Sequence, residues 1–373
     1  MSELFDDFNI EESNELENEI IQIPKEVRKL RTQPYDKSVV DLIEMVKRND
    51  ICLQPSFQRK SVWDNKRCSL LIESIWLNIP IPQVFVSVED DGMWNVIDGQ
   101  QRITALKRYL NNEFKLTGLE VLPELNGKLY KDLESKPQRI LNGGNIRIVA
   151  IHEDSHPDIK FDVFMRINQG AMQLNAQELR NCLYRGDFNN LLHQLVKNEY
   201  LLNILNLKEP HNRFKDVEMV LRYLALSESY HKNFENYPGV MKTFLNGFML
   251  EHRNDNEHLD KLAKDFNENI EKVFTIFGKY SFRKWDVEAQ SFDRNLNLSL
   301  MDSQMLSVEK FSLEQIQDNS EEILQAFKEI FIDPKVEVID AITSGTSSKV
   351  KLITRINFFD EMLNKIINED SKE

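Results

Sequence analysis

The hydrophobic pattern of the first half of the chain predicts helices and strands in alternation. Apolar residues recur with helical spacing over residues 39–46, and Asp36 or Ser38 precedes them as a cap. Asp64 precedes a second helical stretch, which ends before Pro80. These boundaries predict two amphipathic helices within the first 80 residues.

Strand patterns follow the second helix. Residues 84–88 and 93–97 are rich in β-forming residues and flank an Asp-Gly turn, which indicates a hairpin. A helical pattern then runs to about Asn111, and residues 146–151 have the pattern of another strand. The short apolar run at residues 51–53 ends before a proline.

From about residue 158 the periodicity is almost entirely helical, with helix-start signatures at residues 175–178 and 312–315. We therefore expect an α+β fold, with a small mixed-sheet domain followed by an all-helical domain. The expected organisation is an acidic tail over residues 1–30, the sheet domain over 31–180 and the helical domain over 181–373.

Composition excludes several protein classes. The chain has 373 residues and is 41% hydrophobic, which is enough for an ordinary globular core. No run approaches 18 apolar residues and the start does not resemble a signal peptide, so we expect a cytoplasmic protein with no membrane partner. The cysteines, Cys52, Cys68 and Cys182, lack CxxC spacing, and neither a zinc nor an iron site is expected.

The formal net charge of −14 is unevenly distributed. Residues 1–24 contain eight acidic residues and no lysine or arginine, which predicts a solvated, disordered tail. An acidic chain of this kind is not a simple electrostatic clamp for DNA, although a local basic groove is compatible with the overall charge.

The most informative motif lies where a predicted strand meets a predicted helix. The strand ends at Asp98 and Gly99, and Gln100, Gln101 and Arg102 occupy the first turn of the helix. Unpaired backbone N–H groups and the positive end of the helix dipole meet at such a turn, and Gly99 permits close approach of a ligand. The motif therefore predicts an anion site, with phosphate as the expected anion.

Each side chain of the motif suits phosphate chemistry. Arg102 offers a permanently charged fork of donors, and Gln100 and Gln101 can donate to phosphate oxygens or orient a water. Thr104 can cap the helix or contact an oxygen, and Asp98 can hold Mg²⁺, accept from a ribose hydroxyl or act as a base. The simpler alternative is an ordinary helix start, with Asp98 as N-cap and Arg102 at the surface.

A second Gln-Arg pair, Gln58 and Arg59, lies about 43 residues earlier. Two arginines repel each other unless an anion or acid neutralises them, so Arg59 and Arg102 would share an anion if their segments are neighbours. The alternative for this pair is a solvated loop. For Phe57 and Trp63 we favour packing in the core or in a lid over stacking on a base.

Several motifs follow one another in a fixed order along the chain. They are Pro55-Ser56-Phe57-Gln58-Arg59, Val62-Trp63, Leu71-Ile72-Glu73-Ser74-Ile75, Ile79-Pro80-Ile81-Pro82, Ile97-Asp98-Gly99-Gln100-Gln101-Arg102-Ile103-Thr104, Phe164-Met165-Arg166-Ile167-Asn168, Leu174-Asn175-Ala176-Gln177-Glu178-Leu179-Arg180-Asn181, Arg213-Phe214-Lys215-Asp216 and Ser347-Ser348-Lys349-Val350. Together they resemble one family, the N-terminal domain family of GmrSD-type, modification-dependent (type IV) restriction systems. The resemblance covers about residues 31–360.

The resemblance implies a ParB/sulfiredoxin-like fold and NTP binding or hydrolysis, with or without Mg²⁺, in bacterial defence against phage or modified DNA. It assigns catalysis to Asp98, Gln100, Gln101 and Arg102. It assigns nucleotide or phosphate binding to Gln58, Arg59, Gly99, Arg102 and Thr104. Phe57, Trp63, Arg166, Asn168 and Glu178 would close the pocket, and for the last three the alternative is helix capping and salt bridges.

One departure concerns the nuclease. Larger relatives append an HNH-type module with a histidine base, whereas no histidine here lies beyond His258. DNA cleavage would then use the ParB-like site itself or a separate nuclease subunit. Three functions stay open: an NTPase acting in restriction, a DNA-binding sensor without turnover, and a stand-alone ParB-like nuclease.

Overall fold

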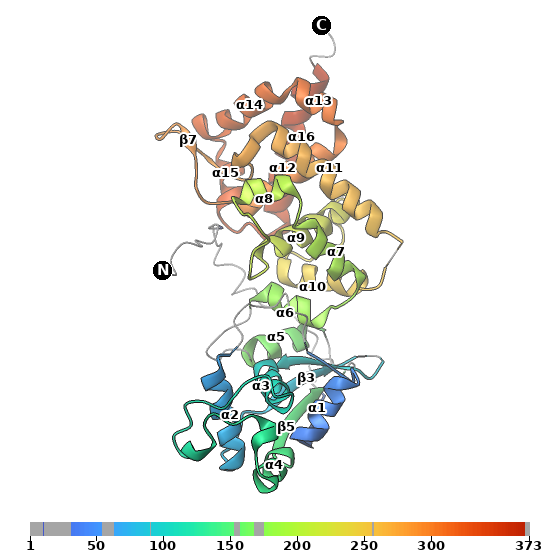
Figure 1. Ribbon diagram of the computed structural model, residues 1–373. Helices are drawn as coiled ribbons and strands as arrows, with labels where there is room; N and C mark the ends of the chain where they lie inside the picture. The colour runs from blue at the N-terminus through green and yellow to red at the C-terminus, as the bar shows by residue number, and fades with distance from the viewer. Residues whose placement is uncertain are drawn as a thin grey trace. The chain divides into compact units, whose positions relative to one another are not determined.

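The computed structural model describes residues 10, 31–53, 63–89, 91–152, 157–167, 175–255 and 257–369. The chain forms two compact units (Figure 1). We call Ile23–Leu183 the sheet unit, and Met1–Gln22 with Tyr184–Glu373 the helical unit. The predicted acidic tail lies outside the described residues except for Ile10, which forms a parallel bridge with Leu296.

The described part of the sheet unit contains a mixed five-stranded sheet in the order β1-β5-β3-β4-β2. The pair β3 and β4 is antiparallel, whereas β2 runs parallel to β4 and β3 parallel to β5. The strands are β1 (Thr32–Ser38), β2 (Ile51–Cys52), β3 (Val84–Val88), β4 (Trp94–Asp98) and β5 (Asn145–Ile151).

Four α-helices accompany the sheet in the colours from blue to green of Figure 1: α1 (Val39–Lys47), α2 (Asn65–Trp76), α3 (Gln100–Leu110) and α4 (Ser135–Asn142). Two 3-10 helices, η2 (Pro123–Leu125) and η3 (Tyr130–Asp132), lie in the connection after α3. Alternate strand residues such as Val84, Val86 and Val96 share one hydrophobic core with Ile72 of α2 and Ile103 of α3. This period of two buries one face of the sheet.

Two further helices, α5 (Pro157–Ile167) and α6 (Ala176–Leu183), complete the described sheet unit. Helix α6 packs against β4. Because Asn95, Val96 and Ile97 are all buried, β4 is covered on both faces. The end of β4 at Asp98 is therefore set on a rigid, central strand.

The helical unit contains α7 (Asp187–Leu195), α8 (Glu199–Leu205), α9 (Lys215–Tyr230), α10 (Met241–Glu251), α11 (Leu259–Phe277), α12 (Leu298–Ser307), α13 (Leu313–Asp318), α14 (Ser320–Ile332), α15 (Val336–Thr343) and α16 (Lys349–Glu369). Short elements η4 (Gly278–Tyr280), β6 (Trp285–Asp286), β7 (Ser291–Phe292) and η5 (Val308–Lys310) lie between them. Helix α12 is buried along its whole length and packs against α9 and α16.

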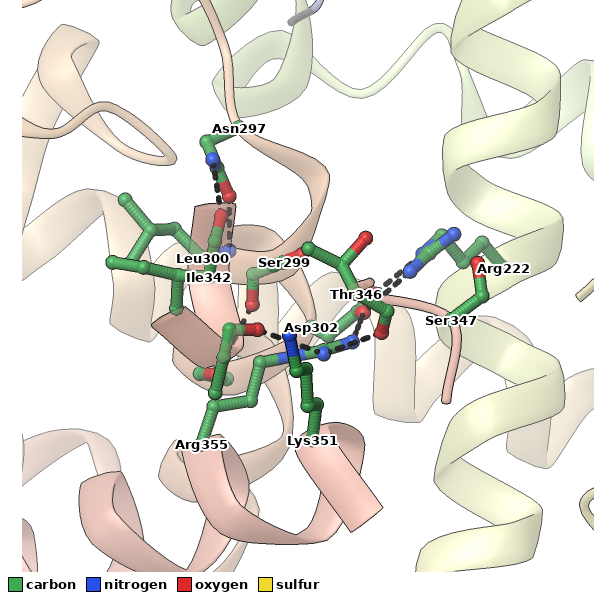
Figure 2. A network of polar contacts seen from close by, with 12 residues as sticks. Arg222, Asn297, Ser299, Leu300, Asp302, Ile342, Thr346, Ser347, Lys351 and Arg355 are labelled. Atoms are coloured by element: carbon green, nitrogen blue, oxygen red, sulfur yellow. Dashed lines mark hydrogen bonds and ion pairs between the residues drawn. The ribbon is translucent and has the colours of Figure 1, made fainter. Parts of the chain in front are cut away.

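A buried ionic network joins those three helices (Figure 2). Arg222 of α9 donates two hydrogen bonds of 2.7 Å to the carboxylate of Asp302 of α12. Arg355 of α16 donates a third of 2.7 Å to the same carboxylate and another to the carbonyl of Thr346. Asp302 and Arg355 are 0% exposed and Arg222 is 6% exposed, so two guanidinium groups share one carboxylate away from solvent.

The helix starts follow the sequence closely. Ser38 caps α1 and Asp64 caps α2, each by accepting a backbone N–H with its side chain. The predicted reciprocal cap is formed between Asn175 and Glu178, with two hydrogen bonds of 2.7 Å. The α+β class is confirmed. Among the described residues, no helix combines the length and the apolar character that crossing a membrane requires.

Candidate functional site

The predicted strand-to-helix turn forms at the end of β4. Gly99 is the N-cap of α3, with a φ of 100°, and as a glycine it has no side chain to cap the helix. A Cβ atom at this position would lie 2.7 Å from Cγ2 of Val84, a buried core residue. Both the backbone conformation and the close approach therefore require glycine. The alternative of Asp98 as N-cap is wrong, because the left-handed glycine stands between Asp98 and the helix.

Asp98 binds Arg102 instead. The Arg102 guanidinium donates two hydrogen bonds. Its Nη2 donates to the Asp98 carboxylate at 2.6 Å, and its Nη1 donates to the carbonyl oxygen of Pro82 at 2.5 Å. Its side chain is only 11% exposed, whereas that of Asp98 is 36% exposed. The register between β3 and β4 shifts beside this point, where Phe85 pairs with Asp98. Such a shift redirects side chains at the end of a strand.

Gln101 faces the chain that enters α2. Its side-chain oxygen Oε1 accepts the backbone N–H of Trp63 at 3.1 Å. The other member of the amide pair, Gln100, and Thr104 one turn further along α3 are both partly exposed. Gln100, Gln101 and Arg102 thus follow Asp98 directly at the start of α3, where Arg102 pairs with Asp98 and Gln101 contacts Trp63.

The second Gln-Arg pair, Gln58 and Arg59, lies outside the described residues, as does Phe57. Convergence of Arg59 with Arg102 therefore stays a prediction. The described residues on either side of that segment are Leu53, which follows β2 alongside β4, and Trp63, which is bonded to Gln101.

Arg108, near the other end of α3, also contacts the backbone of Trp63. This residue was not singled out from the sequence. Its Nη1 lies 3.5 Å from the carbonyl oxygen of Trp63, and its Nη2 donates to Oδ1 of Asn65 at 3.0 Å. The Cys68 thiol also contacts that carbonyl at 3.6 Å, and burial raises the pKa of the thiol. The available signal was the seven-residue spacing of Gln101 and Arg108, which places both on one face of a helix.

The residues expected to close the pocket behave differently from one another. Arg166 is exposed at the end of α5, and Asn168 lies outside the described residues. Glu178 is 1% exposed, and its carboxylate caps α6 through the N–H of Asn175. Trp63 packs partly buried against the core, with the Arg67 guanidinium 4.6 Å from its ring centre.

The acidic and metal-binding side chains near the turn determine which metal ion the site could hold. In the described part of the chain, no group of three or more His, Cys, Asp or Glu side chains is arranged to hold one. The single carboxylate of Asp98 does suit Mg²⁺ that arrives with phosphate oxygens as its other ligands, because Mg²⁺ commonly binds proteins in that way.

Comparison with known proteins gives one match. Residues 39–185 match the family described as the GmrSD restriction endonuclease N-terminal domain. No curated protein matches the chain. No solved structure matches it either, so the ParB/sulfiredoxin-like fold stays a prediction. Residues 39–185 therefore belong to the GmrSD restriction endonuclease N-terminal domain family, which is a family of restriction-system components.

Proposed function

We propose that the chain is a nucleotide-binding, NTP-hydrolysing component of a restriction system, with its phosphate site at the turn from Asp98 to Arg102. The observation that supports this most strongly is the N-terminus of α3 at Gly99, beside the Arg102 guanidinium. Backbone N–H groups at such an end have no partner within the helix, and the helix dipole favours negative charge there. Gly99 supplies the left-handed backbone through which the chain turns from β4 into this end of the helix.

The contacts of Arg102 support a role in holding phosphate. The ion pair with Asp98 and the hydrogen bond to the carbonyl of Pro82 fix the guanidinium plane before a ligand arrives. This lowers the conformational entropy that the side chain loses on binding. A phosphate would compete with Asp98 for the guanidinium, because both are anions that bind the same fork of donors. Charge that develops on the transferring phosphoryl group would be neutralised by this arginine.

The remaining roles follow from the same geometry. Gln100 would orient the attacking water, and Thr104 would contact a phosphate oxygen. Mg²⁺, when bound with a nucleotide, would supply charge neutralisation, and the carboxylate of Asp98 would hold it. Gln58 and Arg59 would add donors from the segment between Leu53 and Trp63, whose described ends lie beside the turn.

The proposal is tested by phosphate release from each of the four nucleoside triphosphates, with and without modified DNA. We expect release from at least one of them, and its loss in Arg102→Ala. The matched control is Arg147→Ala, because Arg147 also pairs with an aspartate, Asp36, at 2.9 Å but lies on β5, two strands from β4. Equal release by wild type and Arg102→Ala would refute the proposed site.

A second function, DNA binding without turnover, is favoured by the charge distribution. Residues 23–183 contain 23 lysines and arginines against 21 acidic residues, although the whole chain has a net charge of −14. A slightly basic unit in an acidic chain can contact DNA phosphates locally. DNA retardation that depends on salt and is unaffected by nucleotide or by Arg102→Ala would support this function over the first.

A further inference from the structure

The backbone of Trp63 is held by two side chains of α3. Gln101 accepts its N–H at 3.1 Å, and Arg108 lies 3.5 Å from its carbonyl oxygen. Both contacts span long stretches of sequence, 38 and 45 residues. The two peptide units on either side of the Trp63 Cα are thus each held by a side chain of the helix whose first turn forms the proposed phosphate site.

This contact sets the polarity of the Gln101 amide. A backbone N–H can only donate, so the atom facing it must be the carbonyl oxygen Oε1 and not the nitrogen. The Nε2 group is then directed away from Trp63. Among the described residues no acceptor for Nε2 is found, and the Gln101 side chain is partly exposed. The amide therefore has two N–H donors available beside the N-terminus of α3.

Arg108 is itself tightly held. Its guanidinium donates to Asn65 at 3.0 Å, lies 3.7 Å from the Glu113 carboxylate and stands over the Phe114 ring at 5.1 Å. A guanidinium with these partners restrains the Trp63 carbonyl, which belongs to the peptide unit after this residue. Through the Trp63 backbone it also restrains the preceding peptide unit, whose N–H Gln101 accepts. Arg108 therefore acts on Gln101 without contacting the first turn.

We infer that Gln101 is an amide donor to phosphate, held in that orientation by the N–H of Trp63, and that Arg108 is a positioning residue that acts through the backbone of Trp63. The inference rests on the proposed phosphate site and refines the role of Gln101, which sequence reasoning left open between donating to phosphate and orienting water. It adds Arg108, nearly two helical turns away, to the residues that determine phosphate affinity.

The test is calorimetric titration with inorganic triphosphate, which carries no base or sugar. Gln101→Glu keeps an oxygen opposite the Trp63 N–H, but it removes the amide donor and adds a negative charge. We expect unfolding by urea to match wild type and the dissociation constant to rise at least about tenfold. Wild-type affinity in Gln101→Glu would overturn the inference, since a residue that only holds Trp63 would tolerate the change.

Arg108 is tested by a double-mutant cycle. Arg108→Ala should weaken triphosphate binding in the wild-type background and have no further effect in Gln101→Glu, because its influence passes through that amide. An equal loss in both backgrounds would show direct attraction of the ligand and overturn the positioning role. If the wild-type protein binds no triphosphate, the proposed function itself fails. If triphosphate binding is lost in Arg102→Ala but unchanged in Gln101→Glu and Arg108→Ala, the proposed function stands and the inference about Gln101 and Arg108 fails.

Discussion

Replacing Asp302 by asparagine should destabilise the helical unit severely. The Asp302 carboxylate accepts three hydrogen bonds of 2.7 Å from Arg222 and Arg355, and all three side chains are almost completely buried. Asparagine has nearly the same shape but carries no charge, and its NH₂ group would face guanidinium donors. Two buried cations would then lack an anion.

The magnitude follows from the burial. Removing one partner of a buried ion pair costs about 3–5 kcal/mol, because the other charge stays desolvated without compensation. Total unfolding free energies are about 5–15 kcal/mol, so this loss is a large fraction of the stability. The exposed pair of Asp36 and Arg147 is the matched control, with side chains 46% and 60% exposed, and Asp36→Asn should cost about 0–1 kcal/mol.

The assay is hydrogen exchange of the full chain, followed in peptides from α9, α12 and α16. We expect exchange in these helices to accelerate in Asp302→Asn while the strands of the sheet unit keep wild-type protection. The apolar triple variant Arg222→Met, Asp302→Leu, Arg355→Met should recover most of the loss, because it leaves no buried charge. Asp302→Asn within about 1 kcal/mol of wild type would refute the reasoning.

Three other predictions concern single side chains. Asp98→Asn should tighten the binding of inorganic triphosphate in metal-free buffer, because Arg102 no longer binds a competing carboxylate. Calorimetry should show a dissociation constant that is roughly threefold to tenfold lower, and weaker binding would contradict this. Burial lowers the pKa of His193 from 6.5 to about 4, so the unfolded chain takes up a proton more readily than the folded protein does. The free energy of unfolding should therefore fall by about 2–3 kcal/mol as the pH drops from 6.5 to 4. Urea titrations should show this slope diminished in His193→Gln, and an unchanged slope would argue against it. Gly99→Ala should cost about 2–4 kcal/mol in thermal unfolding, from the positive φ and the contact with Val84, and an unaffected melting temperature would disprove that strain.

Local signals in the sequence were sufficient for the elements that form the site. Ser38 and Asp64 were recognisable as caps because their side chains bond to the next turn, which depends only on neighbouring residues. The turn at Gly99 was also predictable, because it depends only on the residues next to it in the sequence. The family assignment also followed from ordered motifs and is confirmed over residues 39–185.

Strand β1 was not predicted. It contains Pro34, Asp36 and Lys37, and most of its residues are exposed or partly exposed, so no alternation of apolar and polar residues marks it. It is an edge strand that pairs with β5, where proline and charged residues are tolerated. Its existence depends on the tertiary pairing and not on its own propensity.

Long-range polar contacts were also beyond the sequence. Asp302 lies 80 residues from Arg222 and 53 from Arg355, and no local pattern links them. The carbonyl of Pro82 that accepts from Arg102 is likewise invisible in a sequence, because every residue has such a group. Whether Arg59 joins Arg102 stays a prediction.

The central claim is that nucleotide phosphates bind at the first turn of α3. The most direct measurement is the dissociation constant of a nucleoside triphosphate with Mg²⁺ for wild type, Arg102→Ala and Arg147→Ala at one salt concentration. The account predicts that Arg102→Ala weakens binding by about 2–3 kcal/mol, roughly 30-fold to 150-fold, and that Arg147→Ala binds as wild type does. Equal affinity in wild type and Arg102→Ala would contradict it.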